Sequence, residues 1–283
     1  MSAFSYLTDV EGINIIIGTT WSHTGIPLIE LAKKKNVLMI SPSLGKAEFN
    51  EAGDLFFNTW PHDFILSANL ADYVYEKGHM SVALIGSEQL WVKEQTNAFI
   101  ARFEELGGTV EVLLEPLPDA TEVGSDALKI KNSEDKIDAI ISTTDGILVG
   151  ALVAKKINEL GVDLPMYSIT IGNEDVAAAQ GAYEGMEFLT FLSYTDWFKE
   201  EYDLKYGLEN LDIGAPSAYD AVMMIAQAME ETNSEDPIIL AEYLNSIESY
   251  DGASLILTTD GTGGFVKDYS VKKVVDGKII DLE

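Results

Sequence analysis

Short apolar runs alternate with amphipathic stretches along much of the chain, and this alternation restricts the fold more than any other feature of the sequence. Apolar, β-branched runs bounded by turn residues predict buried strands, and apolar residues spaced three or four apart predict helices. Strands that alternate with helices are typical of a parallel sheet covered on both faces. The predicted strands are 13–18, 37–41, 81–86, 109–115, 137–143 and 166–170, and the predicted helices are 27–35, 64–78, 91–106 and 147–161.

The pattern changes after residue 190. Helices are predicted at about 195–206, 216–231 and 237–246, with no strand between them. The C-terminal stretch KDYSVKKVVDGKIIDLE predicts a hairpin with Asp276 and Gly277 at its turn. The segment 64–170 has enough strands for one complete sheet, whereas 13–41 contains only two.

Composition excludes several classes of function. The 283 residues include 47 acidic and 18 basic side chains, for a formal charge of −29. Such a charge repels phosphate backbones and anionic membranes, so we expect no nucleic-acid partner. The absence of cysteine excludes disulfides, cysteine-bound zinc and thiol catalysis. No stretch approaches the ~18 apolar residues of a membrane span, and the first residues, MSAFSYLTDVEG, lack the features of a signal peptide.

No catalytic motif is present. The chain contains no phosphate-binding glycine loop, no dinucleotide fingerprint and no nucleophile elbow. His23, His62 and His79 lie in separate turns without metal-ligand spacing, as is typical of surface histidines. We therefore expect no enzyme activity, no metal and no cofactor.

Polar turns follow the first two predicted strands. The turn TTWSHTG carries Ser22, Thr24 and Gly25, and SPSLG, residues 41–45, follows the next strand. In doubly wound sheets ligands bind outside the carboxyl ends of the strands, so these hydroxyls and amides are candidates to hold a carboxylate. The alternative is ordinary capping of the following helices by Ser and Thr.

An ordered series of motifs resembles the type I periplasmic solute-binding proteins of ABC transporters, in particular the leucine/isoleucine/valine-binding group. The series comprises IIIGTTWSHTG, VLMISPS, FFNTWPHDF, LADYVYEKGHMSVALIG, FEELGGTVE, IDAIIST, AYEGMEFLT, KYG, SAYDAVMMIAQAM and VVDGKII. The resemblance implies an α/β fold with two lobes, each a parallel sheet covered by helices, that close on a ligand by hinge motion. Lobe 1 would comprise 1–62 and 192–265, and lobe 2 would comprise 63–191 and 266–283, with FFNTWPHDF as the first crossing between them.

The resemblance also implies ligand-binding residues. Ser22 aligns with a serine that holds the α-carboxylate of an amino acid, and Ser43, Leu44 and Gly45 align with a second set of contacts. Trp91 aligns with an aromatic residue that closes over the ligand.

Three further positions follow from the same alignment. Tyr219 aligns with a tyrosine that faces the cleft. Gly45 replaces a usual threonine, and Thr170 replaces the acidic residue that usually pairs with the ligand ammonium. Asp145 is a candidate replacement for that acid. Otherwise the ligand is an amide or another small carboxylate rather than an α-amino acid.

The implied function is binding of a small polar solute, an amino acid or an amide, for an ABC permease outside the cytoplasmic membrane, in the periplasm or at the cell surface. A ligand-sensing regulatory module of the same fold is the alternative; a nucleotide-dependent enzyme and a DNA-binding repressor are less favoured. Family members begin with two further β-α units, ~60 residues, so lobe 1 would be incomplete here. We expect the resulting sheet edge to lower stability and promote self-association.

Overall fold

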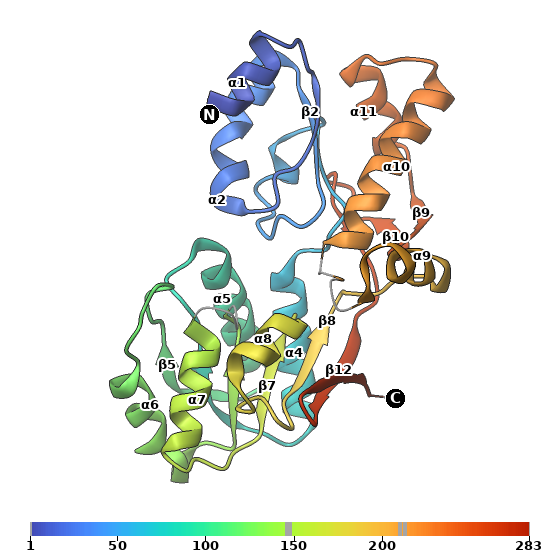
Figure 1. Cartoon of the computed structure of the whole chain (residues 1–283). Coiled ribbons are helices and arrows are strands. Elements are labelled where there is room, and N and C mark those ends of the chain that lie inside the picture. The colour runs from blue at the N-terminus through green and yellow to red at the C-terminus, as the bar shows by residue number, and fades with distance from the viewer. Residues whose placement is uncertain (1, 145–148, 209–210, 212–213, 283) are drawn as a thin grey trace. The chain divides into compact units, whose positions relative to one another are not determined.

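A computed structural model describes residues 2–144, 149–208, 211 and 214–282. The chain divides into two compact units, each built from separate stretches of sequence (Figure 1). Unit 1 comprises Met1–His62 and Leu192–Asp268, and unit 2 comprises Asp63–Phe191 and Tyr269–Glu283. Three linking segments, around residues 62, 191 and 268, therefore connect the units. No described helix has the length and apolar character that a membrane span requires.

Unit 1 contains a three-stranded parallel sheet in the order β1-β2-β3. Leu38 and Ile40 of β2 pack against α10 and α11 on one face, and Met39 between them packs against α1 and α3 on the other. This explains the unbroken apolar run of β2, because both faces of the strand are covered. The elements are α1 (Ser2–Asp9), β1 (Ile15–Ile17), α2 (Ser22–Gly25), η1 (Ile26–Leu28), α3 (Ile29–Lys35), β2 (Leu38–Ser41), η2 (Asn50–Ala52), β3 (Phe56–Asn58), α9 (Asp196–Tyr206), α10 (Ala215–Thr232) and α11 (Pro237–Asn245).

A second, antiparallel sheet in unit 1 has the order β11-β10-β9. Its strands are β9 (Ser249–Gly252), β10 (Leu255–Thr259) and β11 (Phe265–Val266). The backbone N–H of Asn58, the last residue of β3, donates to the carbonyl of Gly263 (3.0 Å), which joins the two sheets. The two strands expected in 13–41 are present as β1 and β2, whereas the sequence pattern predicted neither β3 nor the antiparallel sheet. FFNTWPHDF supplies strand β3 before the chain leaves unit 1 at His62.

Unit 2 contains a seven-stranded sheet in the order β13-β12-β8-β7-β6-β4-β5. β12 pairs antiparallel with β8 and β13, while the remaining neighbours are parallel, which confirms the predicted C-terminal hairpin. The elements are α4 (Asp63–Glu76), β4 (Ser81–Ile85), α5 (Leu90–Glu105), β5 (Thr109–Leu114), α6 (Gly124–Lys131), η3 (Glu134–Lys136), β6 (Ala139–Ser142), α7 (Ala151–Glu159), β7 (Met166–Ile169), α8 (Asn173–Ala179), β8 (Glu187–Thr190), β12 (Ser270–Val275) and β13 (Lys278–Asp281).

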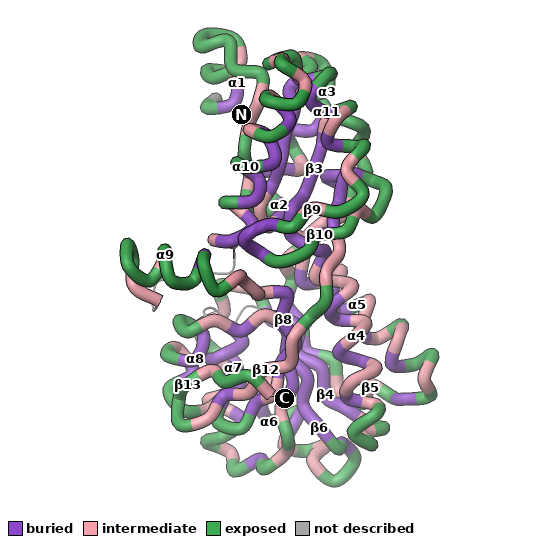
Figure 2. The backbone as a smooth tube through the Cα atoms, turned by 90° about the vertical axis from the view of Figure 1, so that its right-hand side faces the viewer, coloured by how far each residue is buried: buried purple, intermediate pink, exposed green. Residues whose placement is uncertain are grey.

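Helices cover both faces of this sheet. Met166 of β7 packs against the apolar residues of α6 and α7, and the next residue, Tyr167, contacts Tyr73 of α4 edge to face. Because successive strand residues point to opposite faces, α6 and α7 lie on one side and α4 on the other. Figure 2 shows β4 and β6 buried over most of their length. The sequence pattern did not predict α6, α8 or β8.

Candidate functional site

The two polar turns of unit 1 contact each other at the carboxyl ends of β1 and β2. The hydroxyl of Ser41 donates to the carbonyl of Thr19 (2.6 Å) and accepts from the backbone N–H of Leu44 (3.0 Å). A Cβ atom placed on Gly25 would lie only 2.4 Å from Cδ1 of Leu44, so α2 packs directly against the second turn. The two turns therefore pack against each other within unit 1.

Two serines in this region are candidate ligand contacts. Ser22 is the first residue of α2 and is buried. The buried hydroxyl oxygen of Ser43 has no hydrogen-bond partner in the structure. It faces the start of α10, where a Cβ atom on Gly214 would lie 3.6 Å away. A buried hydroxyl without a partner costs on the order of 1–3 kcal/mol, so Ser43 is positioned to bind a further polar group.

Leu44 and Gly45 hold the second turn in place. The side chain of Leu44 belongs to the core with Phe49 and Met39, and its carbonyl accepts from the side-chain amide of Asn58. Nδ1 of His62 lies 3.2 Å from the carbonyl of Gly45, its hydrogen-bond acceptor. The groups of Leu44 and Gly45 described here are thus engaged inside unit 1.

His62 is buried, which corrects the expectation that it is a surface histidine. Burial lowers the pKa of His62, and the negative charge of Asp260 acts against that shift. A neutral imidazole is therefore favoured at neutral pH. His23 is exposed and His79 is half-buried, where it contacts the hydroxyl of Tyr167. In the described part of the chain, no cluster of His and acidic residues could hold a metal ion.

Tyr219 lies in the first turns of α10 and is 42% exposed. Its ring packs edge to face against Trp197 and Phe198 of α9, at 5.5 and 5.7 Å between ring centroids. This places an amphipathic aromatic side chain on the surface of unit 1. That Tyr219 contacts a ligand stays a prediction.

Unpartnered polar atoms also lie at the carboxyl ends of strands in unit 2. Thr170 follows β7 with a φ of 50°, its N–H donates to the carbonyl of Leu189, and its buried hydroxyl has no partner. Ser142, the last residue of β6, and Ser87, just after β4, also carry buried hydroxyls without partners. Sequence reasoning missed these two serines, although a polar residue at the carboxyl end of an apolar strand-like run is the signal that singled out the turns of unit 1.

The other two predicted residues of unit 2 are Trp91 and Asp145. Trp91 is the second residue of α5 and is half-buried, following Leu90 at the start of that helix. Asp145 lies outside the described residues. The roles of both remain predictions.

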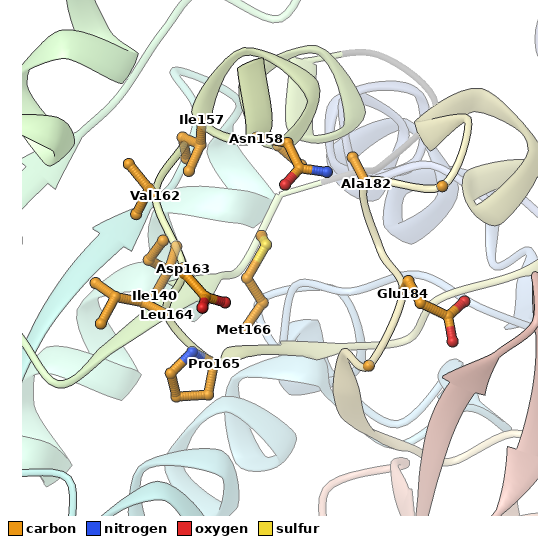
Figure 3. Close-up of a pocket in the computed structure, with 13 residues that line it drawn as sticks. Ile140, Ile157, Asn158, Val162, Asp163, Leu164, Pro165, Met166, Ala182 and Glu184 are labelled. Carbon is orange, nitrogen blue, oxygen red and sulfur yellow. The ribbon is translucent and has the colours of Figure 1, made fainter. Parts of the chain in front are cut away.

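A pocket of about 360 Å³ lies elsewhere in unit 2 (Figure 3). Ile140 and Met166, near the starts of β6 and β7, line it, together with Asn158 and Asp163. The pocket is therefore at the amino-terminal ends of the strands, the opposite sheet edge from Thr170. Its lining contains none of the predicted site residues.

The family is shown by comparison with known proteins. A family model described as periplasmic binding protein matches residues 1–278. The chain belongs to this family. Among curated proteins, the Leu/Ile/Val-binding protein homolog 3 of Brucella melitensis is 23% identical over 288 aligned positions, which cover 96% of this chain and 76% of that protein.

Solved structures share the fold, which confirms the predicted two-lobed α/β class. A leucine-binding protein of Thermotoga maritima superposes with a TM-score of 0.88 at 24% identity, over 100% of this chain and 82% of that one. A solute-binding protein of R. palustris, solved in complex with 4-hydroxybenzoate, gives 0.86 at 18% identity over 100% and 80%. Proteins that share this fold thus include one named for binding leucine and one solved with 4-hydroxybenzoate.

Proposed function

We propose that this protein is the solute-binding component of an ABC transporter and takes a small carboxylate-bearing solute. The observation that carries the proposal is the set of buried hydroxyls without partners at the carboxyl ends of strands, Ser43 in unit 1 and Ser87, Ser142 and Thr170 in unit 2. Ligands of open α/β sheets bind at that edge. Family membership and relatives that bind leucine and 4-hydroxybenzoate support the same function.

Each unit contributes part of the proposed ligand site. In unit 1, Ser22 and Ser43 bind the carboxylate, Leu44 and Gly45 shape the turn, and Tyr219 supplies an aromatic contact. In unit 2, Trp91 covers the ligand, Thr170 offers a hydroxyl to its other end, and Asp145 pairs with an ammonium if the ligand has one. The units close on the ligand by motion at the linking segments, and no bond is made or broken.

The proposal includes a partner and a location. The ligand-bound form is recognised by ABC permease subunits, as the family assignment suggests. The protein acts in the periplasm or on the outer side of the cytoplasmic membrane. Neither metal nor cofactor takes part.

A thermal melt of the purified chain against a ligand panel tests the function. The panel holds leucine, isoleucine, valine, benzoate, 4-hydroxybenzoate, acetamide and ATP. A ligand at 100 times its dissociation constant adds ~2.7 kcal/mol of stability, a shift of roughly 5–10 °C for a chain of this size. A shift with amino acids shows that a side chain of this protein pairs with the ligand ammonium. A shift restricted to benzoates or acetamide shows a specificity that differs from that of amino-acid binders. A shift with ATP alone contradicts the proposal.

A further inference from the structure

A buried carboxylate in unit 1 holds the turn that joins β9 to β10. Asp220 of α10 is fully buried. Its Oδ1 accepts from the N–H of Ala253 (2.6 Å), and its Oδ2 accepts from the N–H (2.9 Å) and the hydroxyl (2.5 Å) of Ser254. Gly252 leaves the space for this contact, because a Cβ atom there would lie 2.4 Å from Oδ1 of Asp220. Both N–H groups of the turn are thus bound by one side chain.

The carbonyl groups of the same turn bind two linking segments. The carbonyl of Ala253 accepts from the N–H of Thr195, just after the chain re-enters unit 1 at Leu192 (2.9 Å). The carbonyl of Ser254 accepts from Nζ of Lys267, just before the chain leaves unit 1 at Asp268 (3.2 Å). The two-residue turn therefore connects the second and third linking segments.

Lys267 also reaches the first linking segment. Its ammonium lies 5.6 Å from the ring centroid of Trp60, close to the point where the chain leaves unit 1 at His62. The neighbouring Thr59 donates its hydroxyl to the carbonyl of Ser217 on α10 (2.9 Å), the helix that carries Asp220. All three linking segments thus contact one cluster, which we call the anchor: Trp60, Asp220, Ala253, Ser254 and Lys267.

The anchor contains charges that are costly to bury. Burial lowers the pKa of Lys267 to about 8, and the carboxylate of Asp220 acts against that shift. Burial raises the pKa of Asp220, while hydrogen bonds from Ser254 and Ala253 and the charge of Lys267 lower it. Burial, with the charge of Asp220, raises the pKa of Tyr250 on β9 to about 12. A merely structural contact between these segments would not require two ionisable groups, because apolar side chains pack there at lower cost.

We propose that Asp220 and Lys267 are positioning residues of a single anchor that holds the unit 1 ends of all three linking segments, so that the segments loosen together and in a proton-linked manner. This deepens the proposed function, since the linking segments are the hinge on which ligand-driven closure depends. All residues of the anchor belong to unit 1.

Hydrogen exchange of the ligand-free chain, read by mass spectrometry, tests the anchor. Asp220→Asn keeps the size of the side chain but places an amide beside N–H donors. We expect peptides that cover 59–63, 192–196, 252–255 and 266–269 to exchange at least about tenfold faster, while peptides of β4 and β5 stay unchanged. Ser254→Ala, which deletes one of the three hydrogen bonds to Asp220, should change the same peptides to a smaller extent and serves if Asp220→Asn does not fold.

Asp236→Asn is the matched control. Asp236 caps α11 in the same unit and accepts from the N–H of Ile238, but belongs to no linking segment. We expect it to affect α11 alone. If Asp220→Asn accelerates hydrogen exchange only in peptides that cover 252–255, its effect is as local as that of Asp236→Asn. The proposal of a shared anchor is then overturned.

The pH profile separates a proton-linked anchor from simple packing. The half-buried Lys267, with a pKa of about 8, binds fewer protons than the released side chain, whose pKa is near 10.5. Opening should therefore become less favourable as pH rises above 8, by up to about tenfold per pH unit. After correction for intrinsic exchange, protection of the linking segments should rise between pH 8 and 9.5. Lys267→Met should abolish this rise, and Lys278→Met, at an exposed lysine of β13, should preserve it.

A flat profile in the unaltered chain, or a rise that persists in Lys267→Met, overturns the role of Lys267. Because none of these measurements needs a ligand, they fail or succeed independently of the thermal-shift panel. A ligand-binding chain with independent linking segments would refute the anchor alone, and a non-binding chain with coupled segments would refute the proposed function alone.

Discussion

At the scale of single residues, two identical serine side chains have different roles because they have different hydrogen-bond partners. Ser41 and Ser43 are two residues apart in the same turn. The hydroxyl of Ser41 links the turn to Thr19 and Leu44, whereas the hydroxyl of Ser43 is buried without a partner. The hydrogen bonds of Ser41 stabilise the protein. The hydroxyl of Ser43 contributes favourably only when another molecule supplies its missing hydrogen bond.

This difference predicts opposite outcomes for two matched substitutions. Ser43→Ala removes an unsatisfied buried hydroxyl, so it should not lower the melting temperature of the ligand-free chain. It should weaken binding of the ligand found in the panel about tenfold, the equivalent of ~1.4 kcal/mol. Ser41→Ala should cost ~1–3 kcal/mol of stability because the hydrogen bonds of its hydroxyl with Thr19, Ser43 and Leu44 are lost. Calorimetric titration and thermal denaturation measure the two effects. Unchanged affinity in Ser43→Ala would remove Ser43 from the proposed site.

At the scale of elements, the first polar turn depends on close packing rather than on propensity. The four-residue α2 has no side-chain cap, and Gly25 at its end fits between Leu44 and Thr19. A methyl group at Gly25 would contact Oγ1 of Thr19 at 2.7 Å as well as Leu44 at 2.4 Å. Neighbouring atoms would have to move, and the two turns of unit 1 would separate.

Gly25→Ala should therefore destabilise the chain by ~1–3 kcal/mol, the usual cost of overpacking, and should also weaken ligand binding. Urea denaturation gives the first quantity and titration the second. Gly124→Ala is the control, since the first atom that its methyl group would meet is 3.7 Å away and alanine favours helix α6. Equal stability of the two variants would show that α2 tolerates displacement from the second turn.

At the scale of the whole molecule, the parallel sheet of unit 1 has an accessible edge. Among the described residues, β1 has β2 as its single strand neighbour. Exposed apolar side chains lie on and around this strand: Val10, Ile13, Ile17 and Trp21. An open strand edge with apolar neighbours is a template for pairing with another chain, and the charge of −29 opposes such contact by repulsion.

We accordingly expect concentration-dependent self-association that increases with salt, as screening weakens the repulsion. Ile17→Lys, at a position that is 42% exposed, should reduce association without lowering the melting temperature. Ile256→Lys is the control, because Ile256 is exposed on β10, which has strand partners on both sides. Sedimentation velocity at several concentrations measures the effect. A monomer at every concentration and salt level would contradict this expectation.

The sequence by itself determined the element types of most of the sheet and helix framework, because each depends on local apolar periodicity. The runs of β2, β4, β6 and β7 and the Asp276-Gly277 hairpin were predicted on that basis, and ordered motifs identified the family. Strand β3 was missed because three residues are too few to establish a period, and β9 to β11 because they are short and show no strict alternation of apolar and polar residues.

Only the tertiary structure decided which polar groups meet. Asp220 and Ser254 are 34 residues apart, and Asn58 and Leu44 are 14 apart. The chain has 47 acidic residues, and no local sequence feature distinguishes Asp220 from the others. Likewise, no local sequence feature distinguishes Ser43 from Ser41. The physical reason is that periodicity reports which face of an element is buried, whereas a hydrogen bond between distant residues depends on how the finished elements pack.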